Sequence, residues 1–307
     1  MNSQNKMTKW KRQYRKKWKH VLYIIPILII WFIFAIYPRI EVFPMSLYEW
    51  NPVTNRKIYK GFYYFKLMFT RNLKYTMRDI KNTCYYVAFL LVIQSVLAMI
   101  LTLALRRDTK VNRFFRAFFF MPMVFSSAMV ALTWSYMYDP NLGVINNILA
   151  MFSDKFPGFS FFDKDWMAIL VVVIVHIWAN IGYTIMILNS GLTTISDELA
   201  EAAKVDGATT WQSFWKIEFP LMLPTFLRMI LMTVSTGAMA CEYQYLLGNK
   251  ADVMTYDTLG TQLYKSLSSA TNYGPVCAVS VCVFFILGGI TLFQYIVMNK
   301  VENRILG

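Results

Sequence analysis

Two polar side chains with helical spacing lie inside an apolar stretch of the sequence, residues 167–192. His176 and Asn180 are four residues apart, so they share one face of a helix, and Tyr183 follows one turn later. The chemistry that they offer is hydrogen bonding, and polar groups in an apolar helix are costly unless they have a use. Two interpretations stay open: the pair lines a polar path, or it bonds a neighbouring helix.

Metal and catalytic chemistry are not indicated by the other reactive residues. No pair of cysteines or histidines has the spacing of metal ligands, and nothing suggests a disulfide framework. The apolar stretches hold almost no carboxylates, which argues against a membrane-embedded enzyme and against an autonomous ion-coupled carrier. The sequence has no Gly-rich phosphate-binding loop with its Lys and Ser/Thr, so we expect another chain to bind any ATP that is used. The residues considered are Cys84, Cys241, Cys277, Cys282, His20 and His176.

The segment 193–221 has the most informative local pattern. Ser196 can cap a helix of good helix formers, in which small alanines leave a slim surface for close approach to a partner. Gly207 then allows the backbone to turn sharply. The expected helix contains Glu201, Ala202 and Ala203, and the expected turn contains Asp206, Gly207 and Ala208.

A second short helix is expected after this turn. Either Thr209 or Thr210 can cap it. We expect Pro220 and Pro224 to mark its end and the start of the next apolar stretch. Its aromatic residues are Trp211, Phe214 and Trp215.

Composition places the chain in a membrane. Hydrophobic residues make up 57% of the sequence, above the roughly 45–50% of a soluble domain, and charged residues only 16% against roughly 25%. Mean hydropathy is +0.40. A soluble chain of 307 residues would have to hide more apolar surface than its interior can hold. Six stretches are long enough to cross the hydrocarbon core, near 21–47, 83–105, 114–138, 167–192, 222–241 and 275–298.

The net charge of +14 has a pattern that favours a membrane surface over nucleic acid. Eight of the 31 Lys and Arg residues lie in the tail 1–20, directly before the first span, as expected at an anionic cytoplasmic leaflet. The short basic loop from Arg106 to Arg113 indicates the same side. We therefore expect a transmembrane domain over 21–298, with the tails 1–20 and 299–307 both in the cytoplasm.

The pattern in 193–221 resembles a known motif. Glu201-Ala202-Ala203, Asp206-Gly207-Ala208, Ile217 and Phe219-Pro220 resemble the EAA loop of permease subunits in bacterial binding-protein-dependent ABC importers. The resemblance extends along nearly the whole chain and points to the carbohydrate-uptake branch, similar to maltose- and glycerol-phosphate-type permeases. The loop after the fifth span of this chain looks closer to the corresponding loop of polysaccharide- and lipoprotein-dependent permeases of Gram-positive bacteria. Further matching residues are Asn82-Thr83, Arg116, Met121-Pro122, Trp134 and Asp139-Pro140.

The resemblance implies an all-α integral membrane protein with about six transmembrane helices and the type I ABC importer permease fold. Residues 193–221 would be its cytoplasmic coupling helix-turn-helix, named the coupling loop below. The implied partners are a second permease subunit, two ABC ATPase subunits that hold ATP and Mg, and an extracytoplasmic binding (lipo)protein that delivers a carbohydrate. No cofactor is expected in this chain, and membrane lipid but no nucleic acid is expected around it. The expected location is the plasma membrane of a bacterium.

The resemblance also implies roles for single residues. Glu201 would be the charged contact to the ATPase, Ala202 and Ala203 its close packing, and Gly207 the turn. Asp206, Ala208 and Pro220 complete this coupling site.

The polar and aromatic residues themselves suggest a substrate path, because a sugar needs hydrogen-bonding groups beside aromatic planes. Glu242, at an outer span end, is a candidate gate or binding-protein contact. The expected substrate path comprises Trp134, Tyr138, His176, Asn180, Tyr183, Glu242 and Tyr243.

Overall fold

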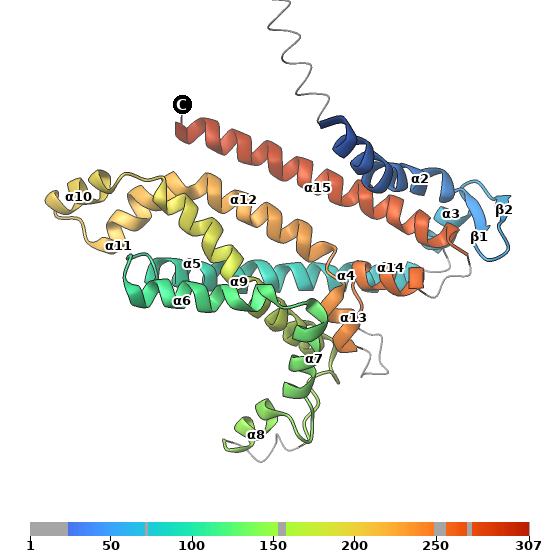
Figure 1. Cartoon of the computed structure of the whole chain (residues 1–307), viewed down its shortest axis with the longest axis horizontal. Coiled ribbons are helices and arrows are strands. Elements are labelled where there is room, and N and C mark those ends of the chain that lie inside the picture. Colours follow the sequence, from blue (N-terminus) through green and yellow to red (C-terminus); the bar gives the residue numbers. More distant parts are fainter. Residues whose placement is uncertain (1–23, 71–72, 153–157, 249–255, 269–271, 307) are drawn as a thin grey trace, which may run out of the picture. The chain divides into compact units, whose positions relative to one another are not determined.

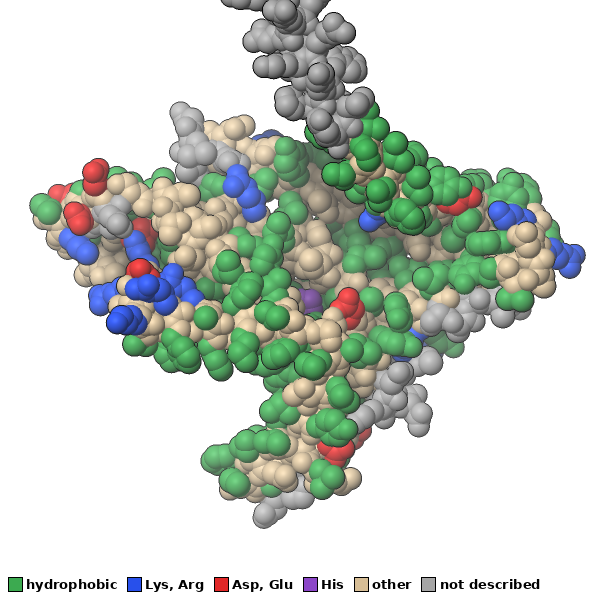
Figure 2. Space-filling model, in the orientation of Figure 1, with side chains coloured by type: hydrophobic (Ala, Val, Ile, Leu, Met, Phe, Trp, Pro, Cys, Tyr) green, Lys and Arg blue, Asp and Glu red, His purple; other side chains and the backbone are tan. Residues whose placement is uncertain are grey.

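The regular structure of the chain is almost entirely helical (Figure 1). The computed structural model describes residues 24–70, 73–152, 158–248, 256–268 and 272–306. Within these residues, five helices are long and apolar enough to cross a membrane, or six if one bent pair counts as a single span. Hydrophobic side chains cover much of the visible surface of these helices, as contact with lipid requires (Figure 2). The all-α membrane architecture expected from the sequence is confirmed. The predicted basic tail 1–20 lies outside the described residues.

The chain divides into two compact units, of which the first comprises Met1–Phe69 and Ala270–Cys282. Its first helix, Ile24–Met45, contains the π-helix η1 (Phe32–Ile36) and α2 (Tyr37–Met45). An antiparallel hairpin follows, which the sequence did not indicate, with Tyr48 opposite Tyr59. The Asn51 side chain accepts hydrogen bonds from two backbone N–H groups in the turn, at 2.9 and 3.2 Å, and thereby fixes it. The remaining elements are β1 (Tyr48–Asn51), β2 (Arg56–Tyr59) and α3 (Tyr63–Thr70).

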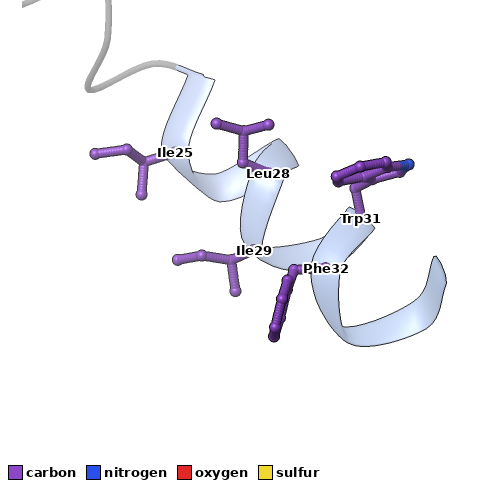
Figure 3. Close-up of a pocket in the computed structure, with 5 residues that line it drawn as sticks. All are labelled: Ile25, Leu28, Ile29, Trp31 and Phe32. Carbon is purple, nitrogen blue, oxygen red and sulfur yellow. The ribbon is translucent and has the colours of Figure 1, made fainter. Parts of the chain in front are cut away.

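The first helix has an exposed apolar surface. Five of its side chains line an open cavity of about 340 Å³ (Figure 3). All five come from this one helix, so the cavity is a surface depression suited to lipid tails or to another apolar helix. Its lining residues offer no cluster of polar or charged side chains that would bind a polar ligand. The lining residues are Ile25, Leu28, Ile29, Trp31 and Phe32.

The second unit comprises Thr70–Ser269 and Val283–Gly307 and is built around the helix α9 (Asp165–Thr193). In the most apolar stretch of α9, 67% of the residues are buried inside the protein, because the second, third and fifth spans all pack against this helix. The second span is a continuous helix, Leu73–Ala104, made of α4 (Leu73–Phe89), the π-helix η2 (Leu90–Gln94) and α5 (Ser95–Ala104). Short helices outside the spans are α8 (Val144–Ala150), α10 (Asp197–Val205), α13 (Glu242–Gly248) and α14 (Leu259–Ser268). The last helix, α15 (Gly274–Leu306), begins in the first unit and ends in the second, and the expected tail 299–307 continues it as far as Leu306.

The third expected span, 114–138, is not one straight helix. The helical run Lys110–Val124 and the helix α7 (Ser127–Met137) meet at an angle of 100°. The bend follows from local chemistry: Phe125 has an extended backbone, and the Ser126 side chain caps α7 by accepting from Met129 N. The run consists of α6 (Lys110–Phe120) and the 3₁₀-helix η3 (Met121–Val124).

The fifth expected span, 222–241, belongs to a longer helix that begins before it and ends at Ala238. Thr210–Ala238 forms one helical run, so the second helix of the coupling loop continues into the membrane and does not end at Pro220. Pro220 has no N–H to donate, and the π-helix η4 directly before it changes the hydrogen-bond register, so the helix continues past this residue. The run consists of α11 (Thr210–Ser213), the π-helix η4 (Phe214–Glu218) and α12 (Phe219–Ala238), and residues 239–241 separate it from α13.

Gly182 allows α9 to approach the third span closely. A Cβ atom at Gly182 would lie against the Phe119 carbonyl oxygen and the Phe120 Cα, inside van der Waals contact distance. Because the obstacle is backbone, we expect Gly182→Ala to lower the free energy of unfolding by about 1–3 kcal/mol. Gly288→Ala is the matched control, since no heavy atom lies within 4 Å of its Cβ position. Thermal melting in detergent checks both variants, and equal melting temperatures would contradict the prediction.

Candidate functional site

The first helix of the coupling loop begins and ends as its sequence predicts. The Ser196 side chain accepts from Glu198 N and caps α10. At the other end Gly207 has a φ of 81°, the left-handed conformation that glycine adopts without strain. Ala208 N donates to Ala203 O at 2.9 Å and Gly207 N to Lys204 O at 3.0 Å, which is the hydrogen-bond pattern of a Schellman cap. Two backbone hydrogen bonds and a left-handed glycine therefore define the turn.

The predicted contact residues of α10 differ in exposure. Glu201 and Ala202 are exposed, whereas Ala203 is buried at 6% exposure because α10 packs against the second helix of its own loop. Val205 is 87% exposed and Trp211 67% exposed, so the tip of the loop presents apolar as well as charged groups. Sequence reasoning did not single out Val205, whose exposure depends on where the turn at Gly207 begins.

The second helix of the loop is held by a capping box and by aromatic rings in edge-on and tilted contact. Thr209 caps it: its hydroxyl accepts from Gln212 N, and its own N–H donates to the Gln212 side chain. The rings form a continuous series along η4 into α12, with centroids 5.5, 4.9 and 5.6 Å apart. This series joins the exposed tip of the loop to the fifth span. Its members are Trp211, Trp215, Phe219 and Phe226.

The coupling loop also makes a charged contact with the end of the second span. Arg106 Nη1 lies 2.6 Å from Glu218 Oε2. Glu218 is the last residue of η4 and is buried. Sequence reasoning missed this pair because its members are 112 residues apart.

His176 and Asn180, the predicted pair on α9, lie together in a polar cluster. His176 Nδ1 is 2.9 Å from the Tyr86 hydroxyl, and the His176 ring packs edge-on against Tyr243 at 5.7 Å. Asn180 donates to the backbone oxygen of His176 at 2.9 Å and lies beside the Tyr243 hydroxyl. Tyr86 joins the cluster from the second span, a partner that sequence reasoning did not identify.

A second polar contact lies one turn further along α9. Gln94 Nε2 donates to the Thr184 hydroxyl at 2.6 Å. Gln94 is 4% exposed, and its Oε1 has no hydrogen-bond partner among the described residues. Gln94 ends the π-helix η2, so a local irregularity in the second span places this amide against the fourth span.

The predicted aromatic residues fall into two groups. Trp134 packs against Tyr138 and Trp178, with ring centroids 5.3 and 5.7 Å apart, and Tyr138 is buried. Tyr183, by contrast, is 41% exposed, and no hydrogen bond or ring contact among the described residues connects it with His176. The structure therefore separates Tyr183 from the cluster that its helical spacing suggested.

Glu242 connects the fifth span with the bent third span. The Ser127 hydroxyl, at the start of α7, donates to the Glu242 carboxylate at the start of α13. Tyr243, the next residue, contacts His176, so α13 brings the predicted gate residue next to the polar cluster.

Asn82 and Thr83 bind the segment after the fifth span. Asn82 Nδ2 donates to Asp257 O at 3.0 Å, and Leu259 N donates to the Thr83 hydroxyl at 3.0 Å. The Asp257 carboxylate is 1% exposed and pairs with Lys265 at 2.8 Å. These contacts fix α14 to the start of the second span, which gives the predicted Asn-Thr pair a structural role.

A polar cavity lies in the first unit. It has a volume of about 710 Å³ and lies beside the β-hairpin. The hydrogen bonds of Asn272, to Trp50 N, Gly274 N and Tyr64 Oη, are made within the chain, so this lining residue is already engaged. The lining residues are Glu49, Asn51, Thr54, Arg56, Ile58 and Asn272.

Comparison with known proteins gives this geometry a family. Residues 94–306 match the family described as binding-protein-dependent transport system inner membrane component. The chain is 28% identical over 287 residues to the multiple sugar-binding transport system permease protein MsmF of Streptococcus mutans, covering 94% of this chain and 97% of the relative.

Two solved structures share the fold. One is a bacterial ABC transporter involved in import of the acidic polysaccharide alginate, with a TM-score of 0.82, 21% identity, and coverage of 95% of this chain and 99% of that chain. The other is a bacterial alginate ABC transporter in complex with an alginate pentasaccharide-bound periplasmic protein, with a TM-score of 0.78, 22% identity, and coverage of 92% and 94%. The matched family and the long apolar helices describe a multi-pass membrane component of a transport system. The chain belongs to the family of binding-protein-dependent transport system inner membrane components.

Proposed function

We propose that this chain is one permease subunit of an ATP-driven importer, and that its substrate is a sugar or oligosaccharide delivered by an extracytoplasmic binding protein. The observation that carries the proposal is the capped helix-turn-helix between the fourth and fifth spans, with Glu201 and Ala202 exposed. The names of similar proteins support the substrate class, since MsmF is described as a multiple sugar-binding permease. The alginate transporter structure, complexed with a sugar-loaded periplasmic protein, supports the delivery step.

In the proposed assembly this chain pairs with a second permease subunit above two ABC ATPase subunits, which hold ATP and Mg. Both termini and the coupling loop face the cytoplasm of a bacterium. Glu201 and Ala202 touch the ATPase directly, while the buried Ala203 supports the loop from inside. Asp206, Gly207 and Ala208 hold the turn, and Pro220 lies where the loop continues into the fifth span. ATP-driven closure of the ATPases biases a two-state movement of this loop.

The proposed substrate path follows the polar cluster of His176, Asn180 and Tyr243. Trp134 and Tyr138 pack against each other, and Trp134 also packs against Trp178 on α9, the helix that carries His176, so these rings would supply aromatic planes along the path. Glu242 closes this region through its hydrogen bond with Ser127.

Reconstitution tests the proposed function. The chain, co-expressed with a partner permease and ATPase and placed in liposomes, is expected to accumulate a labelled oligosaccharide only with ATP and a loaded binding protein. The purified chain alone is expected to bind no nucleotide, because its sequence has no phosphate-cradling loop. Saturable ATP binding or transport by the isolated chain would contradict the proposal.

Two alanine variants decide whether the polar cluster contacts substrate. Each unmet polar group of a buried sugar costs roughly 1–3 kcal/mol, so His176→Ala or Asn180→Ala is expected to lower transport by about tenfold and to change preference among related sugars. Transport competition by related sugars and thermal melting are measured together. Loss of melting temperature with unchanged sugar preference would instead make these residues contacts between helices, as the Tyr86–His176 hydrogen bond alone would predict. Tyr183→Ala is the control, since Tyr183 lies outside the cluster.

A further inference from the structure

A buried ion pair connects the fifth span with the end of the second span. The side chain of Glu218 is 5% exposed, and that of Arg106, which contacts it at 2.6 Å, is 35% exposed. Removing a carboxylate from water is costly, and a buried pair is often no more stabilising than two apolar residues of similar size. Stability alone therefore does not account for this pair.

The ion pairs of the neighbouring residue Asp108 differ from the Arg106–Glu218 pair in their exposure to solvent. Asp108 lies in the same connection, between α5 and α6, and forms ion pairs with Arg113 and Arg116 of α6 at 3.3 and 3.2 Å. The side chain of Asp108 is 73% exposed. Lys and Arg side chains gather at this end of the second unit (Figure 2). Exposed pairs of this kind contribute little, whereas in the Arg106–Glu218 pair the carboxylate is buried and the cation is half-buried.

The position of the pair suggests what it does. Glu218 ends η4, between the exposed tip of the coupling loop and α12. Arg106 is the second residue after α5 and begins the connection to α6. A displacement of the coupling loop therefore reaches the fifth span through continuous helix, and the second and third spans through this ion pair.

We propose that Arg106 and Glu218 are positioning residues for energy coupling: their ion pair makes the second and third spans follow the coupling loop. The inference rests on the proposed function. A π-helical turn at the contact fits this role, because such turns are frequent at functional sites and place a side chain where an α-helix would not. Neither residue touches substrate or ATPase in this proposal.

The test measures sugar uptake per ATP hydrolysed by the reconstituted transporter. Arg106→Gln and Glu218→Gln are each expected to lower this ratio at least fivefold, while the ATPase still co-purifies. The charge swap Arg106→Glu with Glu218→Arg is expected to restore the ratio to within twofold of the wild type. Asp108→Asn, which removes an exposed pair of the same connection, is the matched control and is expected to leave the ratio unchanged.

A neutral pair separates coupling from folding. Arg106→Gln with Glu218→Gln leaves no unpaired buried charge, so its melting temperature is expected to exceed that of either single variant. Its uptake per ATP is expected to stay low. Recovery of both quantities in the neutral pair, or an unchanged ratio in the single variants, would overturn the inference. A wild-type transporter without ATP-driven uptake would instead defeat the proposed function itself.

Discussion

Replacing Glu201 with lysine is expected to reduce ATP-driven uptake by about thirtyfold or more. Glu201 is exposed on α10, and the proposed function makes it the charged contact with the ATPase. Truncating one member of a buried interfacial charge pair costs about 2–5 kcal/mol, and charge reversal adds repulsion to this loss. A cost of 2 kcal/mol corresponds to roughly thirtyfold. Uptake by membrane vesicles and co-purification of the ATPase measure the effect.

The controls for this variant examine charge and location separately. Glu201→Gln keeps the shape and removes only the charge, so an intermediate loss is expected. Asp163→Lys makes the same change at an exposed position in the predicted outer loop and is expected to leave uptake unchanged. If Glu201→Lys assembles with the ATPase and transports at the wild-type rate, Glu201 does not form the coupling contact.

A valine in place of Gly207 is expected to lower uptake by about tenfold without loss of membrane insertion. The φ of 81° is open to glycine but strained for a β-branched residue, whose cost in this conformation exceeds the roughly 1–2 kcal/mol of an ordinary L-residue. No heavy atom lies within 4 Å of the Cβ position, so the effect comes from the backbone and not from a collision. The turn then opens, and α10 leaves its place beside the second helix.

Asparagine supplies the matched comparison at the same position. It tolerates the left-handed conformation better than most residues, so Gly207→Asn is expected to keep most of the uptake. Both variants have larger side chains than glycine, but only valine is strongly strained in the left-handed conformation. A difference in uptake between them therefore reports on backbone conformation and not on side-chain size. Equal uptake by the valine and asparagine variants would show that the left-handed turn is not required.

Local signals in the sequence predicted the coupling loop well. Ser196, Thr209 and Gly207 act through hydrogen bonds and backbone angles within a few residues, so their roles can be inferred without knowledge of the rest of the chain. The apolar runs predicted the membrane class for a similar reason, because hydropathy is a property of consecutive residues.

Features that depend on distant residues could not be predicted in this way. The Tyr86–His176 and Arg106–Glu218 contacts join positions 90 and 112 residues apart. The bend between the third span's two halves has local signals, Pro122 and the Ser126 cap, but averaging hydropathy over 114–138 conceals them. The helix of the fifth span continues past Pro220 because the π-helix η4 precedes this residue. The local sequence has no pattern that predicts a π-helix at this position.

The unbroken helix from Thr210 to Ala238 has a mechanical consequence. At about 1.5 Å per residue it is roughly 43 Å long, so it can act as a lever arm with one end in the coupling loop and the other just before α13. A tilt of about 10° around its midpoint would displace each end by roughly 4 Å in opposite directions. A flexible hinge at the membrane boundary would absorb such a movement. The aromatic rings from Trp211 to Phe226 instead pack against one another across that boundary, so in the proposed transporter a displacement of the coupling loop would be passed on to α12.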